Sequence, residues 1–268
     1  MKKVYFVQAN LSYGNAYYYP YATGCLAAYA WQFESVSSEY EIADFIFKRD
    51  SVKSVTEKII DPDVVAFSCF NWTFEYSKVL ASKIKEKYPE CLIVFGGHQI
   101  SENVDIFPEL PFVDVLIYGE GEIPFRKILE SYAKGESFTD IPNIAYKEDG
   151  RYIHTEKEIY KDLENYVSPY TAGYFDKIYK DNPDVEFCAT IETNRGCPYN
   201  CAYCDWCYST YVRKFPLEKI KQEILWCSEH KVEYIFCADS NFGMFERDLD
   251  IARFVVEVKK KERISVCF

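Results

Sequence analysis

The stretch Glu192–Thr210, ETNRGCPYNCAYCDWCYST, holds four of the chain's eleven cysteines. Pro198 and Gly196 favour a tight irregular loop here rather than a helix. The four thiols follow the spacing Cys197-x3-Cys201-x2-Cys204-x2-Cys207. Such a group could be a disulfide staple, a closed zinc site or an open iron–sulfur site, and the surrounding sequence helps to separate these three.

The length of the chain makes a staple unnecessary, because 268 residues can bury a sizeable core without disulfides. Its start, MKKVYFVQAN, is typical of a first strand rather than a signal peptide, since the apolar run is short and no small-residue cleavage site follows. No uncharged apolar run approaches the roughly 20 residues of a membrane span. We therefore expect a cytoplasmic protein without membrane contact, whose reduced thiols bind metal or take part in chemistry.

The net charge of −11 is unfavourable for binding a nucleic-acid backbone, which depends on clustered lysine and arginine. We therefore do not expect nucleic acid as a partner held by charge. Aromatic residues make up 18% of the chain and are locally dense in YYYPY, Tyr17–Tyr21. Most of them are expected to pack the core.

Residues 1–135 alternate short β-rich runs with longer helical runs such as EYSKVLASKIKEKYP and IPFRKILESYAKG. Alternation of this kind with nearly continuous apolar strands indicates a parallel sheet covered on both faces. The sequence predicts an α/β fold whose first domain is a doubly wound, five-stranded parallel sheet. The predicted strands are 3–8, 41–47, 63–70, 91–96 and 114–118.

Residues 136–184 have a weaker pattern, with a hairpin-like KEDGRY turn, and are expected to form a connector. A second strand–helix series fills residues 185–268, with three strands and two helices. The cysteine loop follows the first of these strands, at the end where barrel enzymes place their chemistry.

The cysteine spacing is unusual for zinc, because zinc sites generally join two short pairs of ligands from separate loops. With Cys207 as a fourth ligand, a closed site for zinc or an electron-transfer cluster stays open as an alternative. The more specific interpretation is that Cys197, Cys201 and Cys204 hold a [4Fe-4S] cluster whose fourth iron lacks a protein thiolate. Cys207 would then be a free thiol nearby.

The segment CPYNCAYC resembles the CxxxCxxC signature of the radical S-adenosylmethionine superfamily, including the aromatic Tyr203 before the last cysteine. The resemblance implies that S-adenosylmethionine chelates the open iron and is cleaved to a 5′-deoxyadenosyl radical. It also implies that the backbone around Tyr203 contacts adenine, and that Asp239, Ser240 and Asn241 meet the methionyl amino group. The second domain would be the first half of a radical S-adenosylmethionine partial barrel.

The first domain resembles the cobalamin-binding domain of B12-dependent radical S-adenosylmethionine enzymes. The resemblance rests on a serine ending the third strand, Ser68, and on a glycine pair after the fourth, Gly96 and Gly97. A Gly-Glu-Gly-Glu run follows the fifth strand, Gly119, Glu120, Gly121 and Glu122. By this resemblance, these residues line or border the groove for the nucleotide tail of cobalamin.

The loop after the first strand, QANLSYGNA, departs from the D-x-H-x-x-G motif that supplies a histidine to cobalt in many cobalamin domains. If cobalamin binds, its lower axial position is not filled by that histidine. An apolar or aromatic residue of the Leu11–Tyr21 segment could face the cobalt instead.

Together these resemblances imply a cobalamin-dependent radical S-adenosylmethionine enzyme, and we expect a methyltransferase that acts on an unreactive centre of a small molecule or peptide. An electron donor such as a flavodoxin or ferredoxin is the implied partner. No catalytic side chain is assigned. A chain that stops after three strands of a barrel leaves an unpaired edge, so we expect a fragment of a longer protein.

Two alternatives remain. One is a non-catalytic protein that binds cobalamin, an iron–sulfur cluster or both. The other is a tRNA methylthiotransferase-like enzyme, in which Cys25, Cys69 and Cys91 would hold a second cluster. Cys69 ends a predicted strand and Cys91 starts one, which puts the two at opposite edges of the sheet and argues against the second cluster.

Overall fold

The structure is a computed structural model that describes residues 1–12, 14–101, 104–206, 209–261 and 265–267. It divides the chain into two compact units. One comprises Met1–Leu11 with Ala22–Glu158, and the other comprises Ser12–Tyr21 with Ile159–Phe268. The segment 136–184, expected as a connector, is therefore shared between the units. Within the described residues, no helix is long and apolar enough to cross a membrane.

The first unit is built on a seven-stranded sheet of order β3-β1-β4-β5-β6-β7-β8. The five predicted parallel strands are confirmed as neighbours within it. A hairpin of β7 and β8 extends the sheet with two antiparallel strands that were not predicted to belong to it. The strands are β1 (Lys2–Asn10), β3 (Tyr40–Lys48), β4 (Val64–Ser68), β5 (Leu92–Gly96), β6 (Val115–Ile117), β7 (Ile144–Glu148) and β8 (Arg151–His154).

The hairpin turn is the predicted KEDGRY segment. Its two loop residues, Asp149 and Gly150, have φ of +48° and +74°. Two consecutive positive φ values give the turn whose twist matches the flanking strands, and Asp-Gly is a favoured sequence for it.

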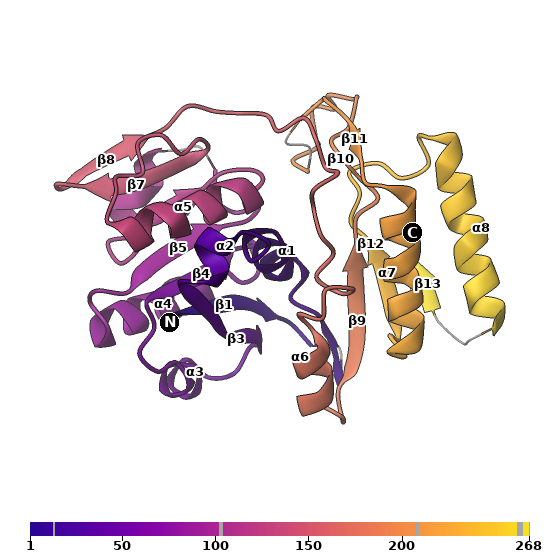
Figure 1. The fold of residues 1–268 in the computed structure, drawn as a ribbon, viewed down its shortest axis with the longest axis horizontal. Coiled ribbons are helices and arrows are strands. Elements are labelled where there is room, and N and C mark those ends of the chain that lie inside the picture. The colour runs from indigo at the N-terminus through magenta and orange to yellow at the C-terminus, as the bar shows by residue number, and fades with distance from the viewer. Residues whose placement is uncertain (13, 102–103, 207–208, 262–264, 268) are drawn as a thin grey trace. The chain divides into compact units, whose positions relative to one another are not determined.

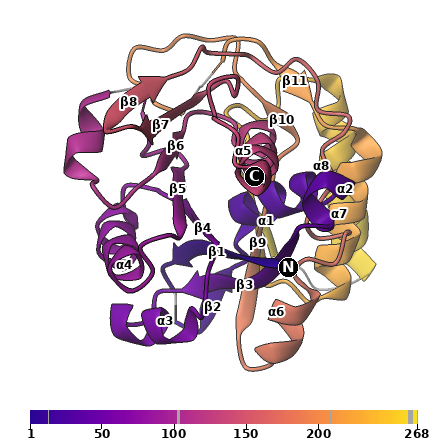
Figure 2. The same ribbon diagram turned by 60° about the vertical axis from the view of Figure 1, so that its left-hand side comes forward.

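Helices cover both faces of this sheet, as Figures 1 and 2 show. Side chains alternate between the faces of a strand. Tyr5 and Val7 of β1 belong to the buried cluster that α3 and α4 complete, whereas the ring of Phe6 lies 5.5 Å from Phe125 of α5. The doubly wound prediction is therefore confirmed. The helices are α1 (Tyr21–Ala30), α2 (Glu34–Ser37), α3 (Val52–Lys58), α4 (Phe74–Lys87) and α5 (Glu122–Lys134), with the 3-10 helix η1 (Val104–Glu109).

The second unit has a parallel sheet of order β13-β12-β9-β2, with α7 and α8 as crossovers (Figure 1). The predicted strand–helix–strand–helix–strand series is confirmed. The edge strand β2 was not predicted: Tyr18 pairs with Cys188 of β9. The elements are β2 (Ala16–Tyr18), α6 (Asp176–Asp181), β9 (Glu186–Ile191), β10 (Asn194–Arg195), β11 (Arg213–Lys214), α7 (Leu217–Glu229), β12 (Tyr234–Cys237), α8 (Glu246–Lys261) and β13 (Ser265–Cys267).

Tyr19 lies at the centre of the aromatic core of this unit. Its ring stacks on Phe187 at 4.3 Å and on Phe175 at 5.1 Å, and it meets Trp226 edge-on at 5.5 Å. Tyr19 is fully buried, which accounts for part of the aromatic density at 17–21. This tyrosine packs a core and is excluded as the residue of the Leu11–Tyr21 segment that faces cobalt.

Candidate cofactor sites at the carboxyl ends of the strands

The cysteine loop leaves the carboxyl end of β9 and is closed at its base by two short antiparallel strands. Asn194 pairs with Lys214 and Arg195 with Arg213. Just inside this base, the Cys197 amide donates to the Ser209 carbonyl at 3.0 Å. The sequence thus folds back on itself and presents the cysteines from a closed loop.

Gly196 is required where the outgoing and returning arms of the loop approach each other most closely. Its φ is +91°, and a Cβ at this position would lie 2.5 Å from the Tyr211 carbonyl oxygen and 2.9 Å from that of Ser209. Only glycine combines a positive φ with so close an approach of backbone. The glycine before Cys197 therefore sets the entrance of the loop.

The described cysteines of the loop, Cys197, Cys201 and Cys204, form no disulfide with one another, which rules out a disulfide staple among them. Cys197 is buried, whereas Cys201 and Cys204 are exposed and joined by a turn in which the Cys204 amide donates to the Cys201 carbonyl at 3.0 Å. Tyr203 is 91% exposed, and a hydrogen bond with the Cys201 side chain raises the pKa of its hydroxyl.

These donors suit an iron–sulfur cluster in type and access, because thiolates are its protein ligands and two of the three are open to solvent. In the part of the chain that is described, no three His, Cys, Asp or Glu side chains lie close enough together to hold a metal ion. The role of Cys207 stays a prediction, since that residue lies outside the described ranges. The assignment of Cys197, Cys201 and Cys204 as ligands likewise stays a prediction.

Asp239, after β12, reaches the base of this loop. Its carboxylate accepts hydrogen bonds from the backbone amide of Thr193 at 2.6 Å and from the Asn194 side chain at 2.7 Å. Burial raises the pKa of Asp239, while hydrogen bonds from Thr193 and Asn194 lower it. Asn241 lies nearby in the chain and is partly buried.

Two more contacts tie the loop to its unit, and neither was predicted. Arg247, at the start of α8, donates to the carbonyls of Thr193 and Phe215 at 2.5 and 2.6 Å. Trp206 of the loop donates to the Ala238 carbonyl at 3.2 Å. The available signal was the polar pair Thr193-Asn194 between a buried strand and the first cysteine, where full burial demands partners.

In the first unit, the predicted groove residues follow three neighbouring strands, β4, β5 and β6. Ser68 ends β4, pairs with Gly96 at the end of β5, and is 6% exposed. Its hydroxyl oxygen is buried without a hydrogen-bond partner among the described groups. A buried hydroxyl left unpaired costs free energy that a ligand's polar group could recover. This orphaned hydroxyl fits a bound cofactor.

Gly97 allows the loops after β4 and β5 to touch. Its φ is +100°, and a Cβ there would lie 2.8 Å from both the amide nitrogen and the carbonyl oxygen of Cys69. The Cys69 amide in turn donates to the Gly96 carbonyl at 2.7 Å. Gly97 therefore allows the loops after β4 and β5 to pack against each other beside Ser68.

The run Gly119–Glu122 follows β6 and leads into α5. Gly119 has a φ of +64°, and a Cβ built there would have no neighbour within 4 Å. Gly121 precedes α5, and a Cβ there would lie 3.0 Å from Leu26. Glu120 is partly exposed. The topology thus brings Ser68, Gly96, Gly97 and the Gly119–Glu122 run to one edge, as the doubly wound fold predicts for a ligand site.

A stacked aromatic pair, half-buried Phe70 and exposed Trp72, lies at the same edge. The ring of Trp72 stacks on Phe70 at 4.9 Å, and Trp72 is 51% exposed. Trp72 lies four residues beyond the end of β4, on the side of the sheet where Ser68 and Gly97 lie. Neither Phe70 nor Trp72 was predicted as a site residue.

Cys25, Cys69 and Cys91 do not form a second metal site. Cys69 follows the end of β4, whereas Cys91 precedes the start of the parallel neighbour β5, so they lie at opposite edges of the sheet. Both are buried, and burial raises the pKa of Cys69 and raises that of Cys91 to about 12. Because one metal cluster cannot reach thiols at opposite edges of a sheet, this placement disfavours the methylthiotransferase alternative.

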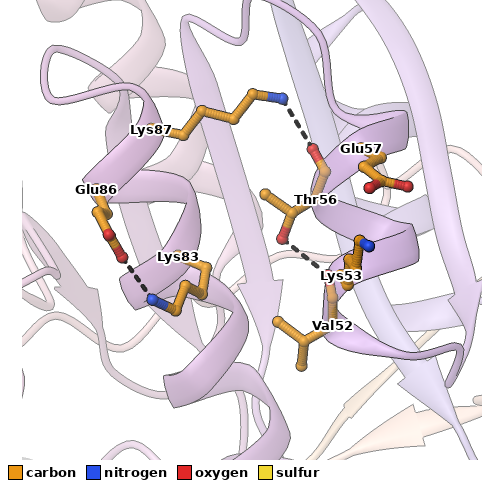
Figure 3. Close-up of a pocket in the computed structure, with 7 residues that line it drawn as sticks. All are labelled: Val52, Lys53, Thr56, Glu57, Lys83, Glu86 and Lys87. Atoms are coloured by element: carbon orange, nitrogen blue, oxygen red, sulfur yellow. Dashed lines mark hydrogen bonds and ion pairs between the residues drawn. The ribbon is translucent and has the colours of Figure 1, made fainter.

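A pocket of about 570 Å³ lies between α3 and α4, away from the predicted residues (Figure 3). Its charged side chains are engaged locally: Lys83 pairs with Glu86 at 2.6 Å, and Lys87 donates to the Thr56 carbonyl at 3.1 Å. Its lining is a pair of solvated helix surfaces and contains none of the cysteines or strand-end residues described above.

Comparison with known proteins identifies relatives of both units. Residues 21–129 match a family model described as a B12 binding domain. The chain is 36% identical over 266 residues to the 2-(S-pantetheinyl)-carbapenam-3-carboxylate methyltransferase of Streptantibioticus cattleyicolor. It is 35% identical over 267 residues to the cobalamin-dependent radical SAM methyltransferase TokK of Streptomyces tokunonensis. Each alignment covers 96% of the chain but only 38% of the relative.

Two solved structures share the fold. The cobalamin-dependent S-adenosylmethionine radical enzyme OxsB superposes with a TM-score of 0.71 at 18% identity, covering 99% of this chain and 38% of that one. The radical S-adenosylmethionine methyltransferase TsrM of Kitasatospora setae gives 0.72 at 14% identity, covering 98% and 52%. The chain thus spans well under two thirds of the proteins it resembles.

Proposed function

This chain belongs to the cobalamin-binding-domain-containing radical S-adenosylmethionine enzymes, and from that premise we propose that it serves a methyl transfer to an unreactive centre. The second unit would hold a [4Fe-4S] cluster and S-adenosylmethionine, and the first would hold cobalamin. When bound, these groups supply the radical chemistry and the methyl carrier, and the protein supplies binding, orientation and exclusion of water.

The observation that carries the proposal is the pairing of two strand-end sites within one chain. One is the loop after β9, which presents three cysteines with no disulfide among them and has Gly196 at its entrance. The other is the orphaned Ser68 hydroxyl beside the close approach of Gly97 to Cys69. Either feature alone occurs in many folds; the two together in a chain related to methyltransferases support this chemistry.

In this proposal Cys197, Cys201 and Cys204 would be the cluster ligands, and the backbone around Tyr203 would lie against the adenine of S-adenosylmethionine. The Ser68 hydroxyl would donate to a polar atom of the cobalamin tail, and the glycines at 96, 97, 119 and 121 would let the backbone approach it. Glu120 would border the cobalamin site, and Asn241 would border the S-adenosylmethionine site.

The proposal also implies partners. Because cluster chemistry needs an external electron, a flavodoxin or ferredoxin is the expected class of donor. The substrate would be a small molecule or peptide, and the net charge of −11 is unfavourable for a nucleic-acid backbone.

The test is anaerobic reconstitution of the chain with iron, sulfide and hydroxocobalamin, followed by electron paramagnetic resonance of the dithionite-reduced protein. We expect a [4Fe-4S] signal that changes shape when S-adenosylmethionine is added, and loss of that signal in Cys201→Ala with cobalamin retained. A cluster spectrum indifferent to S-adenosylmethionine would instead support a closed, non-catalytic site. Two clusters without cobalamin would support the methylthiotransferase alternative.

A further inference from the structure

The carboxylate of Asp239 has its hydrogen-bonding capacity fully used. Oδ1 accepts from the backbone amides of Thr193 and Asn194 at 2.6 and 3.2 Å. Oδ2 accepts from the Thr193 hydroxyl and, at 2.7 Å, from the Asn194 side-chain amide. An ionised carboxylate offers about four acceptor sites. All of them face residues of this chain, which leaves none for the ammonium group of a ligand.

The residues that Asp239 holds are the last ones before the cysteine loop. Thr193 is fully buried and Asn194 is 1% exposed, so neither side chain is accessible to a ligand. Asn194 opens the strand pair that closes the loop, and Cys197 follows three residues later. The hydrogen bonds of Asp239 therefore hold the backbone three residues before the first cysteine, Cys197.

Arg247 also holds Thr193, through its carbonyl rather than through its amide and hydroxyl. Arg247 donates to the Thr193 carbonyl at 2.5 Å and to the Phe215 carbonyl at 2.6 Å, and the Phe215 amide donates to the Thr193 carbonyl at 3.0 Å. Phe215 directly follows β11, the returning arm of the loop. Asp239 and Arg247 thus fix the outgoing and returning arms together.

We propose that Asp239 is a positioning residue for the cluster loop rather than a contact of S-adenosylmethionine. With Arg247 it forms a clamp, defined here as Asp239, Arg247, Thr193 and Asn194, that holds the loop base in the register from which the thiols reach the cluster. This assignment replaces the role that the family resemblance implies for Asp239, and its link to a cluster rests on the proposed function.

The physical expectation follows from how such outer contacts act on metal sites. Groups that orient the ligands without touching the metal typically change metal affinity by about 10–100-fold when removed. Loss of the clamp should therefore weaken iron binding, while S-adenosylmethionine should bind any remaining loaded protein with unchanged affinity.

The experiment compares Asp239→Asn, Thr193→Val and Thr193→Ser with the wild-type chain. Thr193→Val removes a buried donor that no ligand can reach, and Thr193→Ser keeps the hydroxyl as the matched control. Three quantities are measured: amide hydrogen exchange of residues 194–204 in cofactor-free protein, iron affinity in competition with a chelator, and the dissociation constant of S-adenosylmethionine on cluster-loaded protein.

We expect faster exchange and about tenfold or greater loss of iron affinity in Asp239→Asn and Thr193→Val, with the S-adenosylmethionine constant within twofold and Thr193→Ser like wild type. The proposal is overturned if Asp239→Asn weakens S-adenosylmethionine tenfold while exchange and iron affinity stay unchanged. If Asp239→Asn does not fold, the Thr193→Val and Thr193→Ser pair decides by the same readouts. If the wild-type chain takes up no cluster, the proposed function fails. The comparison of amide exchange among the cofactor-free variants still tests whether the clamp holds the loop base.

Discussion

Replacing Gly196 by alanine tests whether the close approach of the two arms at the loop entrance organises the cysteine site. An alanine held at a φ near +91° carries about 1–3 kcal/mol of backbone strain. Its Cβ would also lie 2.5 Å from the Tyr211 carbonyl oxygen, a contact that requires the backbone to move. Overpacking of that kind adds about 1–3 kcal/mol. The summed cost of about 2–6 kcal/mol is enough to open the loop.

Gly243 supplies the matched control. Its φ is +94°, nearly the same as at Gly196, but nothing lies within 4 Å of a Cβ built there. Gly243→Ala therefore carries the backbone strain without the clash. The difference between the two variants isolates the close approach, at about 1–3 kcal/mol.

The assay is urea unfolding followed by tryptophan fluorescence, together with iron retained per chain after reconstitution. We expect Gly196→Ala to unfold at lower urea than Gly243→Ala and to retain less iron. If the two variants have the same urea midpoint of unfolding and the same iron content, the close approach at Gly196 does not organise the loop and the reasoning is refuted.

Three further outcomes are expected. Gly97→Ala should weaken cobalamin binding in absorbance titrations more than Gly119→Ala, because only Gly97 lies against backbone; equal losses would contradict this. Ser68→Ala should stabilise the cofactor-free chain by about 1 kcal/mol by removing an unpaired buried hydroxyl, yet weaken cobalamin about fivefold by removing a hydrogen bond; changes of the same sign would argue against a ligand contact. Iodoacetamide at pH 8 should label Cys201 in the folded, cofactor-free chain but spare Cys69, whose pKa burial raises; mass spectrometry showing fast labelling of Cys69 would be the contrary result.

Local patterns predicted most of the fold. The near-continuous apolar strands of the first unit and the strand–helix series of the second give strong periodic signals, and both appear in the structure. The edge strand β2 escaped prediction because three residues, Ala16–Tyr18, carry no period of their own. Its pairing depends on Tyr19 finding Phe187 and Phe175, which are far away in the sequence.

The candidate sites divide in the same way. Spacing selected the three cysteines, and the resemblance to cobalamin-binding domains selected Ser68 and Gly97 among the residues that follow strands. Both signals are local in the sequence. The clamp was not predictable, because Asp239 lies 46 residues from Thr193 and its four hydrogen bonds depend on two strands meeting at one edge. Only the family resemblance had assigned Asp239 to the methionyl amino group of S-adenosylmethionine.

The most direct test is the metal content of the reconstituted chain, measured as cobalt and iron per polypeptide by elemental analysis. The account predicts about one cobalt and about four iron atoms. It further predicts that replacing Cys197, Cys201 and Cys204 together by alanine removes the iron and leaves the cobalt, while Gly97→Ala lowers the cobalt and leaves the iron. A wild-type chain that binds iron but no cobalt, or that keeps its iron without those three thiols, would contradict it.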